Sequence, residues 1–235
     1  MKYALILSFF LNVSFSIAVF AADEISDQLK AMIVLAELGD AEAQYDLALA
    51  YDFADGAPED HIEAAKWYLK AAQQGHMDAQ YNLAVSYDDG EGVAEDDVAA
   101  TVWYRKAAEQ GDAKAQYNLA QSYDNGEGVE VDHAEAVDWY RKAAAQGHTS
   151  AQYNLAVSYD EGEGVRQNHE EAVKWYVKAA KAGDPEAQYN LAVSYEIGEG
   201  IEKNEGEAVK WYRRAAAQGD VDAEARIKAL DSAKK

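Results

Sequence analysis

Pairs of glycines separated by one residue are the first pattern in this sequence that could serve chemistry. They lie at Gly90/Gly92, Gly126/Gly128, Gly162/Gly164 and Gly198/Gly200. Glycines at this spacing bind phosphate in nucleotide-binding loops, where a strand precedes them and a helix opens at a third glycine. Here a helical pattern precedes each pair, and the residue between the glycines is a glutamate, which repels phosphate. We therefore interpret these glycines as the ends of helices.

Acidic segments and histidines are candidates for metal binding. Asp88-Asp89-Gly90-Glu91 and the equivalent loops lack the 12-residue ligand spacing of a calcium loop. Weak binding of divalent cations along these loops is the alternative. No two histidines have the i, i+4 spacing of a helical metal site, and we interpret them as solvated surface residues. They are His61, His76, His133, His148 and His169.

Catalysis requires one distinct group of acid, base or nucleophile in a pocket. The chain has no cysteine, and nearly all its polar residues recur in several equivalent copies. The sequence therefore predicts no catalytic residue, no metal and no cofactor, and we expect that the protein is not an enzyme.

The elements that position these residues form an internal repeat. All five tryptophans are spaced by 36 residues, and each is followed by tyrosine. The tryptophans are Trp67, Trp103, Trp139, Trp175 and Trp211. The tripeptide Ala-Gln-Tyr recurs at the same spacing, so independent markers agree on one period.

Each unit has the pattern of two helices. In the second unit, Ala79, Leu83, Ser86 and Tyr87 fall on one face of a first helix. The second helices begin after an N-cap residue, and in four units a glutamate three residues later predicts a capping box. These N-caps are Asp60, Asp96, Asp132, Asn168 and Asn204. A glycine then ends each second helix.

The repeat predicts an all-α solenoid. Five units occupy residues 40–75, 76–111, 112–147, 148–183 and 184–219. Residues 22–39 match a second helix alone and residues 220–235 a first helix with a tail. We expect these half-repeats to cap the two ends of the solenoid.

The motif Ala-x-x-x-Leu-x-x-x-Tyr-x-x-Gly-x-Gly-Val, a spacer and Trp-Tyr-x-Lys-Ala-Ala-x-x-Gly resembles the Sel-one-like repeat, a relative of the tetratricopeptide repeat. Residues 79–111 carry it clearly, and the later units repeat it. Where the family usually has glycine after the leucine, this chain has alanine, as at Ala84. The resemblance implies a right-handed α/α superhelix that serves protein–protein interaction. Bacterial members similar to this chain are often exported.

The net charge of −22 indicates which classes of partner the protein is suited to bind. Affinity for nucleic acids and anionic lipids rests mainly on lysine and arginine, so we expect no nucleic-acid partner. A basic protein partner fits this charge, and solubility alone is the alternative reading.

Residues 1–21 have the pattern of a secretory signal peptide. Lys2 precedes an apolar run from Tyr3 to Phe20, and Val19 and Ala21 stand at the positions that a signal peptidase inspects. An uncleaved membrane anchor is the alternative. We expect a periplasmic or secreted monomer that has no contact with the membrane once this segment is removed.

The candidate binding surface is the side of the first helices opposite Ala79, Leu83 and Tyr87, because first helices line the concave groove in the related fold. Tyrosine and asparagine rows run along it, namely Tyr81, Tyr117, Tyr153 and Tyr189 with Asn82, Asn118, Asn154 and Asn190. Val85 and Gln121 belong to a third row, and Lys114 occupies a position that varies between units. Amides and tyrosines suit an extended peptide. The alternative is that these rows hold neighbouring units together.

These observations predict an exported scaffold that binds a peptide or protein partner in the concave groove of the solenoid. Two other functions remain open. One is a secreted hydrolase that processes cell wall or β-lactams, as has been suggested for some members of the family it resembles. The other is a structural spacer in the cell envelope.

Overall fold

The computed structural model describes residues 27–233, and all the regular structure in that range is helical. The helices are α1 (Asp27–Glu37), α2 (Ala41–Asp52), α3 (His61–Gln73), α4 (Met77–Asp89), α5 (Asp97–Gln110), α6 (Ala113–Asn125), α7 (His133–Ala145), α8 (Thr149–Glu161), α9 (His169–Ala182), α10 (Pro185–Ile197), α11 (Glu205–Ala217) and α12 (Val221–Ala233). The predicted signal peptide lies outside the described residues.

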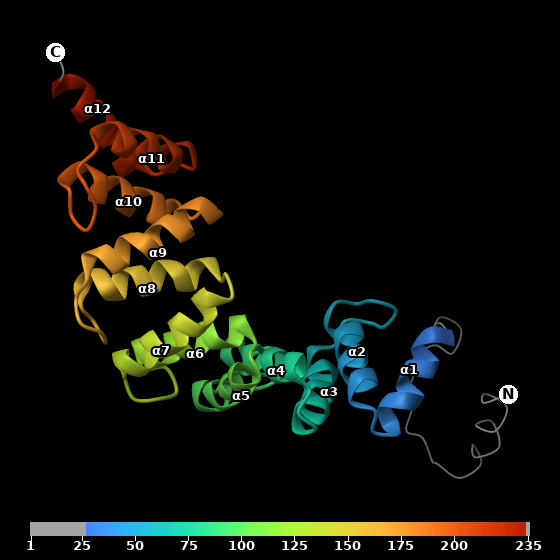
Figure 1. Ribbon diagram of the computed structural model, residues 1–235. Helices are drawn as coiled ribbons and strands as arrows, with labels where there is room; N and C mark the ends of the chain where they lie inside the picture. Colours follow the sequence, from blue (N-terminus) through green and yellow to red (C-terminus); the bar gives the residue numbers. More distant parts are fainter. Residues whose placement is uncertain (1–26, 234–235) are drawn as a thin grey trace, which may run out of the picture.

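The helices are stacked in one row in the order of the chain. Every extensive helix–helix contact joins two helices that are consecutive in sequence. Figure 1 shows that the row bends, which gives it a concave and a convex side, and that α1 and α12 lie at its opposite ends. The prediction of an all-α repeat superhelix is confirmed.

Each repeat is held together by alanine, leucine and tyrosine. Leu83 on α4 and Tyr104 on α5 are buried, and alanines of both helices, such as Ala84 and Ala107, are fully buried. The small alanine side chain lets two helices come close, while the leucine and tyrosine fill the space on either side. The same residues recur in the other repeats, so each repeat has the same core.

The second helices begin at the predicted N-caps, but the predicted capping box forms only in half. Asp60 Oδ1 accepts from the Glu63 backbone N–H at 3.0 Å, as expected. The reciprocal bond is replaced, because the Asp60 N–H donates to the carbonyl of Tyr51. The Glu63 carboxylate instead accepts from Lys66. The prediction of a reciprocal box was therefore wrong, since the loop already satisfies the backbone N–H that a box would use.

The glycine pairs have two different roles. Gly198 has a φ of 80° and caps the C-terminal end of α10, which confirms the interpretation as a helix stop. Gly200 lies against the preceding repeat, where a Cβ atom would stand 2.2 Å from the carbonyl oxygen of His169. The second glycine of each pair therefore allows the loop of one repeat to touch the second helix of the repeat before it.

Candidate functional site

The predicted surface on the first helices α4, α6, α8 and α10 is made of neighbouring, half-buried side chains. We call it the first-helix surface; its residues are Tyr81, Asn82, Val85, Lys114, Tyr117, Asn118, Gln121, Tyr153, Asn154, Tyr189 and Asn190. All of them are half-buried except Lys114, which is exposed. The surface is therefore partly anchored in the fold and partly open to solvent.

Each tyrosine of this surface packs on the buried tyrosine of the second helix in its own repeat. The ring centroids of Tyr81 and Tyr104 lie 6.0 Å apart, and those of Tyr153 and Tyr176 lie 6.2 Å apart. Burial raises the pKa of Tyr81, with a further contribution from the negative charge of Asp112. One side of each ring is thus fixed by the core, and the exposed remainder is held in a defined place.

The asparagines connect one repeat to the repeat before it. The amide of Asn190 donates to the hydroxyl of Tyr176 over 3.5 Å. Asn118 lies close enough to the hydroxyls of Tyr81 and Tyr104 to oppose the rise in pKa of both groups. The tyrosine and asparagine rows therefore form one polar strip that crosses every repeat junction between α4 and α10.

The variable position at the start of each first helix sets the charge along the strip. Lys114 Nζ lies 5.8 Å from the centroid of the Tyr81 ring, a cation–π contact across a repeat junction. Glu186 lies at the equivalent position of α10 and, behind burial, contributes to the raised pKa of Tyr153. The strip is therefore acidic towards its two ends and carries a cation near its middle.

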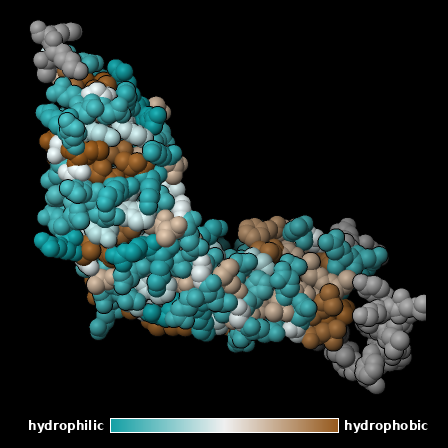
Figure 2. Space-filling view, in the orientation of Figure 1, coloured by the Kyte–Doolittle hydropathy of each residue, from teal (hydrophilic) through white to brown (hydrophobic). Residues whose placement is uncertain are grey.

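The wider surface is hydrophilic. Figure 2 shows polar residues over most of the visible face, with apolar residues in separate patches. Within residues 27–233 no helix is both long enough and apolar enough to cross a membrane.

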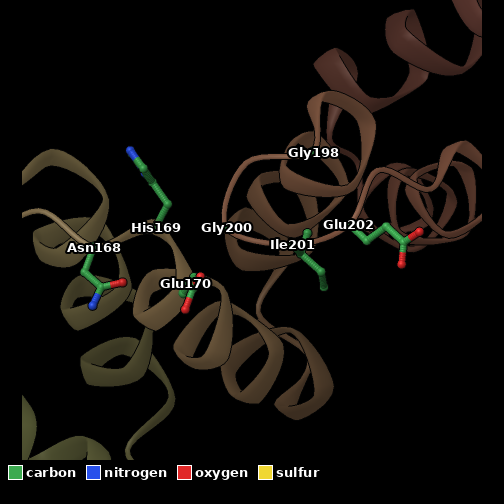
Figure 3. A pocket seen from close by; sticks show the side chains of 7 residues that line it. All are labelled: Asn168, His169, Glu170, Gly198, Gly200, Ile201 and Glu202. Carbon is green, nitrogen blue, oxygen red and sulfur yellow. The ribbon is translucent and has the colours of Figure 1, made fainter.

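A hollow of about 590 Å³ lies between the start of α9 and the loop that follows α10. Its lining includes His169, Glu170, Ile201 and Glu202, together with the glycines of that loop. In Figure 3 the His169 side chain points the opposite way from Glu170, so the polar groups do not converge on one point. The arrangement is that of a junction between repeats, not of a reaction centre.

Three histidines interpreted as solvated surface residues belong instead to hydrogen-bonded networks. His133 Nδ1 lies 2.8 Å from Asp124 Oδ1, and Asp124 also accepts from the buried Tyr140 hydroxyl. The hydrogen bond to Asp124 raises the pKa of His133, with smaller contributions from nearby acids. His61 and His169 have equivalent partners. Sequence spacing missed these contacts because they join the end of a first helix to the start of the next helix.

The other two histidines cap first helices. His148 Nδ1 accepts from the Ala151 backbone N–H at 3.3 Å, and its ring stacks on Tyr117 with centroids 4.6 Å apart. Burial lowers the pKa of His148. His76 caps α4 in the same way. These rings also differ from the solvated residues that the sequence suggested, since both are half-buried and the ring of His76 stacks on Tyr45 as that of His148 stacks on Tyr117.

A row of buried glutamines was not singled out from the sequence. Gln80, Gln116 and their equivalents at the second position of Ala-Gln-Tyr are each buried, and the Nε2 atom of Gln80 donates to the Ala72 carbonyl at 3.0 Å. The recurrence of glutamine in Ala-Gln-Tyr was the available signal. It passed unnoticed because a polar residue beside a tyrosine suggests a surface position.

The chain was compared with known proteins. The model of the Sel1 repeat matches residues 41–76, 78–112, 113–148, 149–184 and 185–220. A crystal structure of c5321, described as a protective antigen of uropathogenic Escherichia coli with an SLR fold, is similar with 36% identity and a TM-score of 0.81. That match covers 85% of this chain but only 43% of c5321. A Sel1 repeat protein from Oxalobacter formigenes is 34% identical with a TM-score of 0.72, over 86% of this chain and 87% of that one. The search of curated proteins found no match.

Proposed function

This chain belongs to the Sel1 repeat family, whose members generally mediate protein–protein interaction, and from that premise we propose that it is an exported scaffold that binds an extended segment of a partner protein along the first-helix surface. In this proposal the surface lines the concave side of the bent row of helices.

The observation that carries this proposal is the continuous strip of half-buried tyrosines and asparagines. An extended segment has backbone donors and acceptors at regular intervals, and each asparagine amide can supply either kind of group. The tyrosine rings offer apolar surface that is already ordered by the core, so little conformational entropy is lost on binding. A strip that repeats at every junction suits a ligand that is long and regular.

The charge of the chain favours a partner segment with lysine or arginine. The net charge is −22, and acidic residues such as Asp78 and Glu186 lie at the edge of the strip. Opposite charge speeds the encounter of two proteins and rejects acidic competitors. Lys114 adds a single cation near the middle, where an acidic residue of the partner segment fits.

The proposal places the mature protein outside the cytoplasm, in the periplasm or the medium. It rests on the pattern of residues 1–21, which has the short basic start and apolar run of a signal peptide. A chain without cysteine needs no disulfide for its fold in an oxidising compartment. Edman sequencing of the secreted product tests this part, and a mature N-terminus at Ala22 is the expected result.

Affinity capture tests the binding surface. Wild-type protein and a Tyr81→Ala/Tyr117→Ala/Tyr153→Ala variant are used as baits against envelope extract and culture medium. A second variant, Asn82→Ala/Asn118→Ala/Asn154→Ala, removes the amides and keeps the aromatic packing. The control variant, Lys66→Ala/Lys174→Ala/Lys210→Ala, changes exposed residues of the second helices.

We expect the same partner to bind wild type and control and to be lost from both surface variants, with far-ultraviolet circular dichroism showing that all four baits are helical. Equal capture by all four baits would refute the proposal.

A further inference from the structure

Four repeats contain a pair of glutamines that bond to each other, and in three of them the pair also bonds to the repeat before it. The side chain of Gln110, at the end of α5, donates from Nε2 to Gln80 Oε1 at 2.7 Å and to the Gly75 carbonyl at 3.0 Å. Gln146 and Gln218 make the corresponding two bonds, and Gln74 makes the first of them. One NH₂ group therefore serves two acceptors.

The fourth repeat lacks this donor. Ala182 stands where the other repeats have Gln74, Gln110, Gln146 and Gln218. Gln152 still donates to the Ala144 carbonyl at 3.2 Å and is only 8% exposed. Within residues 27–233, no group donates to Gln152 Oε1. The carbonyl of Gly147 also lacks the glutamine donor that the equivalent carbonyls of Gly75, Gly111 and Gly183 have.

The missing side chain leaves a notch with two acceptors and no donor. Neither oxygen has a side-chain donor within the described residues, so a group that donates from outside can bond to both without replacing a bond of the fold. In the described residues, every polar side-chain atom that is completely buried has a hydrogen-bond partner. Because the Oε1 atom of Gln152 has no such partner, it must be in contact with solvent.

Acidic residues lie close in sequence to the notch. The notch lies in the turns that join α7 to α8 and α9 to α10, where the dipoles of two helix C-termini and two helix N-termini oppose each other. Asp184 and Glu186 follow Ala182 by two and four residues. Lys181 is the opposing charge, and its side chain is exposed beside the notch.

We propose that the notch formed by Gln152, Gly147 and Ala182 is a binding site for a nitrogen that carries two or more N–H bonds, such as the ammonium of a lysine side chain on the partner. This inference rests on the proposed function, because it assigns an anchor residue to the partner segment. The side chain enters where the glutamine of the other repeats lies, and its nitrogen donates to Gln152 Oε1 and to the Gly147 carbonyl. A primary amide has the same donors, and the experiment separates the two sources.

Nuclear magnetic resonance of ¹⁵N-labelled protein tests the site through the side-chain NH₂ signals of Gln152. The probe is Nα-acetyl-lysine N-methylamide, and Nα-acetyl-glutamine N-methylamide tests the amide. Nα-acetyl-norleucine N-methylamide, which has no side-chain donor, is the negative control. We expect a saturable shift at Gln152 with the lysine probe at a Kd on the order of 1 mM, a weaker one with glutamine and none with norleucine.

Two matched variants decide whether the notch itself is responsible. Ala182→Gln restores the residue of four other repeats and should remove the shift at Gln152. Gln110→Ala opens an equivalent notch at Gln80 and should create a second shift there. Equal shifts in wild type and Ala182→Gln, or equal shifts with norleucine, would overturn the proposal. The absence of any shift at a probe concentration of about 50 mM would also overturn it.

The same variant separates this inference from the wider proposal. In the affinity capture, the tyrosine variant can lose the partner while Ala182→Gln captures it as well as wild type does. That result would refute the notch as an anchor site and would support the scaffold function. Capture that is reduced several-fold by Ala182→Gln supports both. Equal capture by the tyrosine variant and wild type would refute the proposed scaffold function. The titration with the lysine probe would then still test the notch.

Discussion

The hydroxyl of Tyr104 donates a hydrogen bond of 2.9 Å to Asp88 Oδ2, and so joins the middle of α5 to the end of α4. Tyr104 is buried and Asp88 is exposed, so the bond fixes a surface carboxylate to the core of the repeat. The bond recurs with Tyr68, Tyr140, Tyr176 and Tyr212 as donors. It thus sets the position of the loop that follows each first helix.

Removing this hydroxyl should destabilise the protein without changing its shape. Tyr104→Phe is expected to lower the free energy of unfolding by about 1 kcal/mol, because the bond to a charged acceptor is lost while the ring still fills the core. Urea unfolding monitored by circular dichroism measures it. Tyr212→Phe is the matched control. It should cost less, since its acceptor Glu196 also pairs with Arg226. Equal losses would contradict this account.

The N-cap role of His148 predicts a dependence on pH. Burial holds its pKa below the usual value of 6.5, and only the neutral ring can accept from Ala151. Its contribution to stability is therefore complete above pH 6.5 and decreases as the pH falls below that value. His148→Asp supplies the cap that Asp112 and Asp184 provide in other repeats.

Urea midpoints from pH 7.5 to pH 5 measure this effect in wild type and in His148→Asp. The difference between the two proteins isolates His148 from the remaining histidines. We expect the variant to lose less stability on acidification, and parallel curves would show that His148 does not couple to unfolding.

The hydrogen-bonded networks of three other histidines predict a pKa shift in the opposite direction. Hydrogen bonds to Asp52, Asp124 and Asp160 raise the pKa of His61, His133 and His169. Their stabilising effect is present below pH 6.5 and is lost as the pH rises through the higher folded-state pKa. An imidazole titration by nuclear magnetic resonance should place these three above 6.5 and His148 below it. Any other order would show that the networks differ from those described.

The second glycine of each pair predicts a large effect from a single methyl group. Gly200→Ala places a Cβ 2.2 Å from the His169 carbonyl oxygen at a φ of 68°. Backbone strain and overpacking should together lower the free energy of unfolding by about 3 kcal/mol. Gly111→Ala is the control. Its φ is also positive but its Cβ meets no atom within 4 Å, so a loss of about 1 kcal/mol is expected. Thermal unfolding of both variants checks the difference.

The sequence predicted the fold because its signals are local. Asp96 and Gly111 mark the two ends of α5, and a 36-residue period repeats such marks along the chain. Contacts between repeats were less accessible. Gln110, for example, donates to the carbonyl of Gly75 in the repeat before it, and no short window of sequence contains both residues.

The candidate site was predicted only as a set of positions. Tyr81 and Asn118 were expected to face the groove, and the structure shows that they are in contact with neighbouring residues of the fold. A half-buried residue can hold repeats together and bind a partner with different atoms of the same side chain. Residue type and spacing do not distinguish contacts between repeats from contacts with a partner. A measurement of partner binding is needed to distinguish them.

The extensive contacts of each helix are with its neighbours in the chain, and this has a consequence for how such a protein can change in evolution. Because most residues of each junction recur in the other junctions, inserting or deleting one 36-residue block should leave the two new neighbours complementary. The length of the solenoid and its number of binding positions can therefore change by one repeat at a time, while the local environment of each tyrosine is preserved.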